Sequence, residues 1–313
     1  MRSISAPEID AALTFPSLIG ALSDAFRGQF FAPTRHHHVI AQAGGAPATH
    51  LLMPAWDSTG EYIGVKIVNV FPDNGRLGLP AVLGTYVLQS GKTGETLAVL
   101  DGSRLTPWRT AAASGLATRF LARRDSRKLL IVGAGALAPF LARAHASERE
   151  IETVQIWNHR PEGARKTAEA LNAQGVRATA VEDLQRAVGE ADIISCATLA
   201  QTPLISGAWL KPGQHLDLVG AFNMTMREVD DLALKRSRIF IDTPAALSEG
   251  GDVALALQSG AIQKSDVVAD LAALVQGAAG RGAAEEITLF KSVGAAIEDL
   301  AAAILVYKTS GGG

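Results

Sequence analysis

Hydrophobic and polar positions in the middle of the chain alternate between two periods. Residues 129–132 are continuously apolar, which is typical of a strand covered on both faces. Leu137, Phe140, Leu141 and Ala144 then recur at helical spacing. Further strands are predicted at 153–157, 177–181, 192–197, 215–220 and 238–242, with helices over 161–173 and 183–188. This alternation predicts an α/β fold with a doubly wound parallel sheet over roughly 125–290.

Extended patterns dominate the first part of the chain instead. Residues 62–71 and 81–88 are predicted to be strands. They are followed by Pro72-Asp-Asn-Gly75 and Ser90-Gly-Lys-Thr-Gly94, which are turn signals. Residues 291–307 are predicted to form an alanine-rich amphipathic helix that returns to these strands. The pattern therefore predicts a second α/β domain that precedes the parallel sheet.

Composition and charge narrow the classes of function. The chain has 313 residues, of which 48% are hydrophobic, and a formal net charge of −2. This balance gives no electrostatic case for a nucleic-acid or membrane partner, and no run is apolar enough to span a bilayer or to form a signal peptide. The single cysteine, Cys196, excludes an internal disulfide and fits a reducing compartment. We therefore expect a cytoplasmic protein that acts on small molecules.

A glycine turn follows the first strand of the predicted parallel sheet. Gly133, Gly135 and Ala138 have the spacing of a dinucleotide-binding unit. Gly133 would allow the tight turn, Gly135 would let backbone amides approach a pyrophosphate, and Ala138 would let the helix pack on the sheet. The amides and the dipole at the start of that helix favour an anion. The alternative is a glycine-rich turn that binds nothing.

The residues that end the second strand indicate which dinucleotide is bound. In units that bind NAD, a carboxylate at this place accepts hydrogen bonds from the ribose hydroxyls. Here the place is held by Asn158, His159 and Arg160, with Arg165 and Lys166 in the next helix. A ribose 2′-phosphate needs charged donors and is repelled by a carboxylate. We therefore expect NADP(H) to be preferred, with NAD(H) possible; in the alternative, these cations form only a solvated helix start.

Two cations outside this unit stand in unusual places. Thr106 and Pro107 predict a helix start, which would put Arg109 in the first turn, where a cation opposes the helix dipole. A visiting carboxylate would explain this position. Lys66 lies within the apolar run 62–71, so it must snorkel, pair or face a cleft. A surface arginine and an edge strand are the alternatives.

Arg35-His36-His37-His38 contains adjacent histidines, as some metal sites do. In an extended segment they point to alternate sides and do not converge on one ion, and no cysteine pair or Glu-x-x-His helix assists them. We therefore expect no metal. Cys196 is interpreted as a small core residue because it has apolar neighbours and no activating base.

Six segments, in their order along the chain, resemble the ornithine cyclodeaminase/μ-crystallin family. They are Gly64-Val-Lys-Ile-Val, Leu105-Thr-Pro-Trp-Arg-Thr-Ala-Ala, Val132-Gly-Ala-Gly-Ala, Ala191-Asp-Ile-Ile-Ser-Cys-Ala-Thr198, Met226-Arg-Glu-Val-Asp230 and Thr288-Leu-Phe-Lys-Ser-Val-Gly294. The resemblance covers nearly the whole chain. It implies a Rossmann dinucleotide-binding domain of residues 116–290. It also implies a discontinuous substrate-binding and dimerisation domain, residues 1–115 with 291–313, in a homodimer.

The resemblance also implies a set of site residues. Lys66 and Arg109 would be the catalytic cations that anchor the carboxylate of an imino or amino acid. The other substrate contacts would be Arg35, Met53, Phe222, Ser292 and Gly294. The cofactor contacts would be Thr110, Gly133, Gly135, Ala136, Leu137, Asn158, His159, Arg160, Arg165, Ala197, Thr198, Val219, Gly220 and Ser292.

Two departures from the family's ornithine cyclodeaminases bear on the reaction. Phe222 stands where those enzymes carry an aspartate after the fifth strand, and Leu52 precedes Met53 where they carry a glutamate. A phenyl ring accepts no proton, so deamination of ornithine lacks its base. The Gly-Ala-Phe222 ending looks most like the ketimine-reductase branch, which reduces Δ1-pyrroline-2-carboxylate and related cyclic imino acids.

We therefore expect an NADPH-dependent reductase of proline metabolism. It would reduce Δ1-pyrroline-2-carboxylate or Δ1-piperideine-2-carboxylate to L-proline or L-pipecolate, by orientation and electrostatics, in a pocket without a general base. One alternative is an ornithine cyclodeaminase or amino-acid dehydrogenase that uses NAD, with Asp217, Glu228 or Asp230 replacing the missing acid. Another is a crystallin-like protein that binds NADPH with little turnover.

Overall fold

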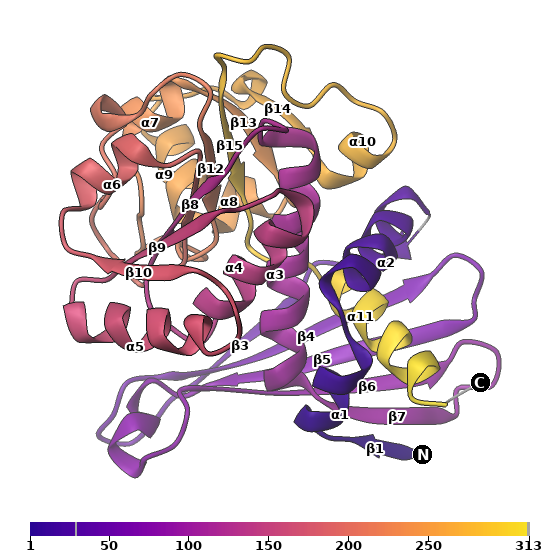
Figure 1. Ribbon diagram of the computed structural model, residues 1–313. Helices are drawn as coiled ribbons and strands as arrows, with labels where there is room; N and C mark the ends of the chain where they lie inside the picture. Colours follow the sequence, from indigo (N-terminus) through magenta and orange to yellow (C-terminus); the bar gives the residue numbers. More distant parts are fainter. Residues whose placement is uncertain (29, 312–313) are drawn as a thin grey trace. The chain divides into compact units, whose positions relative to one another are not determined.

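The computed structural model describes residues 1–28 and 30–311 and divides into two compact units (Figure 1). Unit 1 comprises Met1–Thr110 with Ala295–Gly313, and unit 2 comprises Ala111–Gly294. The divisions expected from the sequence were 115/116 and 290/291. The first division lies inside helix α3 (Gly102–Leu121).

Unit 1 contains a seven-stranded sheet in which β5 is a central strand. The strand order is β1-β7-β6-β5-β4-β2, and β3 also pairs with β4. The strands are β1 (Arg2–Ile4), β2 (Phe30–Phe31), β3 (His36–Ile40), β4 (Ala48–Asp57), β5 (Tyr62–Val70), β6 (Val82–Ser90) and β7 (Thr96–Asp101). Because β5 lies between β4 and β6, Lys66 is not on an edge strand, and that alternative is wrong.

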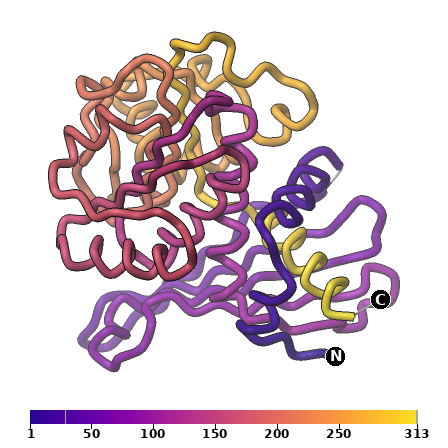
Figure 2. The backbone as a smooth tube through the Cα atoms, in the orientation of Figure 1, coloured from indigo at the N-terminus to yellow at the C-terminus, as the bar shows by residue number. Residues whose placement is uncertain are grey.

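Three helices pack on one face of this sheet. They are α1 (Ala6–Ala12), α2 (Phe15–Arg27) and α11 (Ala296–Thr309), and the short 3-10 helix η1 (Pro72–Leu77) connects β5 to β6. Figure 2 shows the C-terminal helix beside the N-terminal ones. Along residues 1–28 and 30–311, no single helix is long and apolar enough to cross a bilayer; α1 and α2 pass that test only as a pair bent by 85°.

Alternation along the strands divides the side chains of the sheet in unit 1. On the helix-covered face, Met53, Lys66 and Tyr86 are buried. On the other face, Val65 is opposite Val87, and Val87 is opposite Val99, in one apolar row that is only half-buried. The sheet therefore has a second apolar face that no helix of this unit covers.

Unit 2 contains an eight-stranded sheet whose neighbouring strands are all parallel. Its order is β10-β9-β8-β11-β12-β15-β13-β14, so the direction of winding changes between β8 and β11. The strands are β8 (Lys128–Val132), β9 (Thr153–Trp157), β10 (Ala178–Val181), β11 (Ile193–Cys196), β12 (His215–Leu218), β13 (Ser237–Ile241), β14 (Val267–Asp270) and β15 (Ile287–Lys291). The predicted doubly wound parallel sheet is confirmed.

Short helices connect these strands. They are α4 (Ala138–Glu148), α5 (Pro161–Asn172), α6 (Leu184–Glu190), α7 (Asp231–Lys235), α8 (Ala246–Glu249), α9 (Gly251–Gln258) and α10 (Leu271–Val275), with 3-10 helices η2 (Gly207–Trp209) and η3 (Lys264–Asp266). Leu130, Ile194, Leu216 and Leu289, from four adjacent strands, are completely buried in one core. The continuous apolar runs of the sequence thus mark strands that are covered on both faces.

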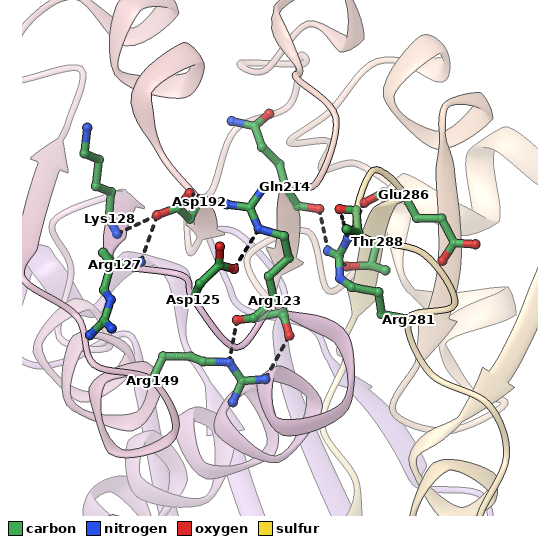
Figure 3. A network of polar contacts seen from close by, with 12 residues as sticks. Arg123, Asp125, Arg127, Lys128, Arg149, Asp192, Gln214, Arg281, Glu286 and Thr288 are labelled. Carbon is green, nitrogen blue, oxygen red and sulfur yellow. Dashed lines mark hydrogen bonds and ion pairs between the residues drawn. The ribbon is translucent and has the colours of Figure 1, made fainter.

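Charged side chains tie together the amino ends of the central strands (Figure 3). Asp192 accepts the backbone amides of Arg127 and Lys128 at 2.8 and 2.9 Å, and its other oxygen accepts Nη2 of Arg123 at 2.9 Å. Arg149 donates to carbonyl groups at the end of α3, including that of Arg123 at 2.7 Å. These contacts stabilise the edge of the sheet at which the strands begin. Ligands of such sheets bind at the opposite edge, where the strands end.

The helix that carries Arg109 begins earlier than predicted. α3 starts at Gly102, and the side chain of Asp101 accepts the backbone amide of Arg104 at 2.9 Å. Pro107 therefore lies inside the helix, and the Thr106 hydroxyl donates to the Gly102 carbonyl. The prediction that Arg109 lies in the first turn is wrong, and so is the dipole argument that rested on it.

Candidate functional site

The glycine turn after β8 has the geometry that a dinucleotide-binding unit needs. Gly133 has φ of 110°, and a Cβ atom there would lie 2.5 Å from the Ala197 carbonyl oxygen, so only glycine fits. At Gly135 a Cβ would have no heavy atom within 4 Å. α4 begins at Ala138, which is buried against the sheet. The exposed backbone at the start of this helix fits a pyrophosphate.

Most of the other predicted cofactor contacts lie at the same edge of the sheet. Ala197 and Thr198 follow β11, Val219 and Gly220 follow β12, and Ser292 follows β15. Because neighbouring strands are parallel, their carboxyl ends share one edge, which is where ligands of these sheets bind. Ala136 and Leu137 lie between Gly135 and α4, whereas Thr110 lies on α3 in unit 1.

The segment after β9 carries the predicted phosphate donors. The Asn158 amide donates to the Arg160 carbonyl at 3.0 Å, and Nε of Arg160 lies 3.2 Å from Nε2 of His159. Arg165 forms an exposed ion pair with Glu182, 3.6 Å away. Glu182 follows β10 and was not expected from the sequence to contact Arg165. Arg160 is exposed at the end of β9, where a ribose phosphate could reach it.

Glu228 joins the carboxyl ends of β11 and β12. Its Oε1 accepts the amide and hydroxyl of Thr198 at 2.7 and 2.8 Å, and its Oε2 accepts the amides of Gly220 and Ala221 at 2.8 and 3.3 Å. Burial raises the pKa of Glu228 to about 7. Because both carboxylate oxygens accept backbone amides, Glu228 holds together the segments that follow β11 and β12, where the predicted cofactor contacts lie.

Two more buried acids stabilise this edge. Asp252 accepts the Glu228 amide at 2.7 Å and forms an ion pair with Lys291 at 3.1 Å. Asp242 accepts the amides of Val293 and Gly294, both at 2.7 Å, and the Ser292 hydroxyl at 3.2 Å. Asp242 therefore holds in place Ser292 and Gly294, which the resemblance assigned to the site.

The other acids weighed as substitutes for the missing aspartate also have structural bonds. Asp217 accepts Ser195 at 2.6 Å and lies 3.1 Å from His145, deep in the core. Asp230 accepts the Ala233 amide at 2.8 Å and begins α7. Phe222 is 46% exposed just after β12. The side chain at position 222, shortly after the end of β12, is thus apolar and not an acid.

Lys66 and Arg109 lie together in unit 1, within a buried cluster of four charges. Lys66 Nζ lies 2.9 and 2.8 Å from the two oxygens of Asp299. Arg109 donates through Nε to Asp299 at 3.0 Å and through Nη1 to Glu298 at 2.8 Å. All four side chains are at most 7% exposed. We call these four residues the charge cluster.

Two acids that the sequence had not assigned to the site lie beside the two cations, where they form ion pairs. Glu298 and Asp299 come from α11, and Asp299 is 233 residues from Lys66 in the sequence. The surface-arginine alternative for Arg109 is wrong too, because its side chain is buried. Burial and the neighbouring Arg109 lower the pKa of Lys66 to about 8, against the effect of Asp299. Lys66 thus forms an ion pair with Asp299, and pairing was one of the three outcomes predicted for it.

Other predicted substrate contacts lie on the same unit or outside it. Met53 is the register partner of Lys66 on β4 and is buried. Arg35 precedes β3 and is half-buried, whereas His36–His38 are exposed. Phe222, Ser292 and Gly294 belong to unit 2. Across residues 1–28 and 30–311, no group of three or more histidine, cysteine or acidic side chains is arranged to hold a metal ion.

Comparisons with known proteins show the family and the fold of the chain. The sequence profile of the ornithine cyclodeaminase/mu-crystallin family matches residues 8–313. The Δ1-pyrroline-2-carboxylate reductase of Paracoccus denitrificans is 39% identical over 323 residues, which cover 99% of each chain. The structure of Thermococcus litoralis Δ1-pyrroline-2-carboxylate reductase in complex with NADH and L-proline has a TM-score of 0.93 at 34% identity, covering 99% of this chain and 97% of that one.

An archaeal alanine dehydrogenase dimer with bound NAD has a TM-score of 0.91 at 29% identity, covering 99% of this chain and 96% of that one. The similarity therefore extends over nearly the whole chain, as the six sequence segments predicted. The chain belongs to the ornithine cyclodeaminase/mu-crystallin family.

Proposed function

We propose that this oxidoreductase uses NADPH to reduce a cyclic ketimine acid in the cytoplasm. The substrate is Δ1-pyrroline-2-carboxylate or Δ1-piperideine-2-carboxylate, and the product is L-proline or L-pipecolate. The observation that carries the proposal is the pairing of Lys66 and Arg109 on one buried face of unit 1. Support also comes from the Paracoccus reductase, which is similar over its full length.

The two cations retain donors for a substrate carboxylate. Among the described residues, Lys66 contacts the two oxygens of one carboxylate, that of Asp299, although an ammonium has three N–H donors. The two hydrogen bonds of Arg109 use Nε and Nη1, so neither uses Nη2. Charge-assisted bonds from these donors would anchor the acid and orient its C=N carbon.

When bound, the nicotinamide cofactor would supply the hydride. A cyclic imine is partly protonated near neutral pH, so the chain does not need to provide a strong acid. Its residues bind and orient the substrate: Lys66 and Arg109 would hold the carboxylate. Catalysis then rests on positioning and on fixed charges.

A single pair of assays tests the reaction. Purified protein with NADPH and Δ1-pyrroline-2-carboxylate should consume NADPH, followed at 340 nm, whereas NAD with ornithine should release no ammonia. Activity only with ornithine would refute the proposal in favour of cyclodeamination. Tight binding of NADPH without turnover on either imino acid would favour a crystallin-like role.

The preference for NADPH is expected to depend on Arg160. Replacing Arg160 with alanine should raise the Michaelis constant for NADPH about tenfold and leave that for NADH unchanged, because only NADPH carries the phosphate. Arg186→Ala removes an exposed arginine of α6 and is the control. A wild-type protein with a clear preference for NADH would contradict this part of the proposal.

We also propose that the chain forms a homodimer through the apolar face of unit 1. The row Val65, Val87 and Val99 lies on the face without helices, and Ile63 on the same face is 37% exposed. A second copy would cover this surface. Sedimentation velocity should give a dimer for the wild type and a monomer for Ile63→Asp combined with Val87→Asp. A monomeric wild type would overturn this assignment.

A further inference from the structure

The charge cluster is neutral as a whole, although each of its members is charged. Lys66 and Arg109 contribute two positive charges, and Glu298 and Asp299 contribute two negative charges. The exposed fractions of the side chains are 2%, 7%, 0% and 0%, respectively. Burial of an unbalanced charge is costly, whereas balanced pairs at hydrogen-bond distance are tolerated. The cluster is therefore stable before any ligand arrives.

Asp299 occupies the centre of this cluster. Its Oδ1 accepts from both Lys66 and Arg109, at 2.9 and 3.0 Å, and its Oδ2 lies 2.8 Å from Lys66. Within the cluster, Glu298 accepts a hydrogen bond from Arg109. α11 carries both acids and packs against β4, β5 and β6 of the same unit. Asp299 thus fixes the distance between the two cations.

A neutral buried cluster discriminates between ligands by their net charge. An acid with a carboxylate alone adds one uncompensated negative charge beside Glu298 and Asp299. An acid with a cationic nitrogen next to its carboxylate adds no net charge, and the two acids attract that nitrogen. Proline and the protonated form of a cyclic imino acid are of this second kind.

We propose that Asp299 is a positioning residue that makes the site select acids bearing a positively charged nitrogen over acids bearing a carboxylate alone. This inference rests on the proposed function, because it takes the ligand of Lys66 and Arg109 to be an imino or amino acid. It goes beyond that function by assigning the selection to a residue of the C-terminal helix.

A buried hydroxyl beside the cluster gives independent support for a polar ligand. Tyr86 is the register partner of Lys66 on β6, and its hydroxyl has no hydrogen-bond partner among the residues that the structure describes. Its ring lies over Gly64, where a Cβ would be 2.0 Å from the hydroxyl oxygen. Burial, and then the charge of Asp299, raise the pKa of Tyr86, so the hydroxyl stays protonated. A polar ligand would provide the missing partner.

Two ligands of one shape test the selection. L-proline and cyclopentanecarboxylate share the ring and the carboxylate and differ in the nitrogen. Calorimetry with the full chain and saturating NADPH measures both without turnover, because NADPH and proline are both in the reduced state. The wild type should bind L-proline at least about 30-fold more tightly. Asp299→Asn should reduce this ratio to about threefold or less, without weakening the binding of cyclopentanecarboxylate.

The pH dependence of binding separates this role from a purely structural one. Lys66 is faced by Arg109 from α3, by Glu298 and Asp299 from α11, and by Tyr86 from β6. Its pKa is about 8, so the affinity for L-proline should fall as the pH rises above 8 in the wild type. The negative charge of Asp299 raises the pKa of Lys66, so Asp299→Asn should move this fall to lower pH. A residue needed only for folding would leave the position of the fall unchanged.

Asp10→Asn is the matched control. Asp10 pairs with Arg104 of α3 at 2.6 Å and accepts from Trp108, so this change removes the same charge outside the cluster. It should leave the ligand ratio as in the wild type. Glu298→Gln is the second variant, since it also unbalances the cluster while keeping the bonds of Asp299. It should reduce the ratio even if Asp299→Asn does not fold.

The outcomes separate the selection from the reaction. If the ratio in every folded cluster variant equals that of the wild type, or if both ligands weaken equally, the inference is overturned. If the wild type shows the ratio but reduces no ketimine, the selection stands and the proposed function fails. If the wild type turns over imino acid but binds both ligands equally, the proposed function stands and the inference about Asp299 is overturned.

Discussion

Replacing Arg109 with alanine is expected to raise the Michaelis constant for the imino acid by about 30- to 1000-fold. Charge-assisted bonds from an arginine to a carboxylate contribute about 2–4 kcal/mol, and each 1.4 kcal/mol corresponds to about tenfold. The dissociation constant for NADPH should stay unchanged, because the glycine turn belongs to unit 2 and Arg109 to unit 1. Steady-state kinetics and fluorescence titration measure the two constants.

The same substitution removes one charge from a balanced buried cluster. Glu298 would lose its 2.8 Å contact with Arg109, and Asp299 would lose one of the two cations that it contacts among the described residues. Breaking a buried pair on one side costs about 3–5 kcal/mol, so Arg109→Ala should also lower the free energy of unfolding by about that much. Urea denaturation measures this loss. The kinetic effect must therefore be separated from the effect on stability.

A double variant separates the two effects. Arg109→Ala with Glu298→Gln removes one charge of each sign, so it should recover most of the lost stability while the Michaelis constant stays high. Arg104→Ala is the control for α3, because Arg104 lies on the same helix as Arg109 but pairs with Asp10 of α1. Recovery of the wild-type Michaelis constant in the double variant would remove Arg109 from the substrate site.

Local patterns were sufficient to predict the parallel sheet and the cofactor edge. The strand before Gly133, the turn itself and the start of α4 are neighbours in sequence, so hydropathy and glycine spacing identify them together. Lys66 is a harder case, since its sequence pattern allowed snorkelling, pairing or a cleft. The central position of β5 and the partner on α11 decide the outcome, and both depend on contacts far apart in the chain.

The acids of the charge cluster show why part of the site was missed. Glu298 and Asp299 lie in the first turn of α11, where acidic residues complement the helix dipole in any protein. Their sequence context therefore looks ordinary, although both are completely buried. The error at Thr106 has a similar origin: its pattern with Pro107 resembles a helix start, but Asp101 begins the helix earlier.

The acids at the cofactor edge were hidden for a related reason. Glu228 was weighed only as a substitute for a missing catalytic acid, because sequence shows the residue type but not its bonds. In the structure its four donors come from the ends of β11 and β12, and they are separated from it by 7 to 30 residues. Only the folded sheet brings them together.

The largest expected effect on cofactor binding comes from the glycine turn. Gly135→Ala should raise the dissociation constant for NADPH more than about tenfold while leaving stability unchanged. A Cβ at this position meets no heavy atom of the chain within 4 Å, so the fold accepts it, and Gly135 is not among the glycines with positive φ. The added methyl group would instead stand where backbone amides meet a pyrophosphate.

Gly133→Ala is the matched comparison, because it should lower both NADPH binding and stability, whereas Gly135→Ala should lower NADPH binding alone. Its φ of 110° and the 2.5 Å contact with the Ala197 carbonyl should cost about 2 kcal/mol or more of folding free energy, in addition to the loss of NADPH binding. Fluorescence titration and urea denaturation distinguish the two glycines. If Gly135→Ala bound NADPH as tightly as the wild type, the pyrophosphate would have to lie elsewhere, and the assignment of this turn as the cofactor site would be wrong.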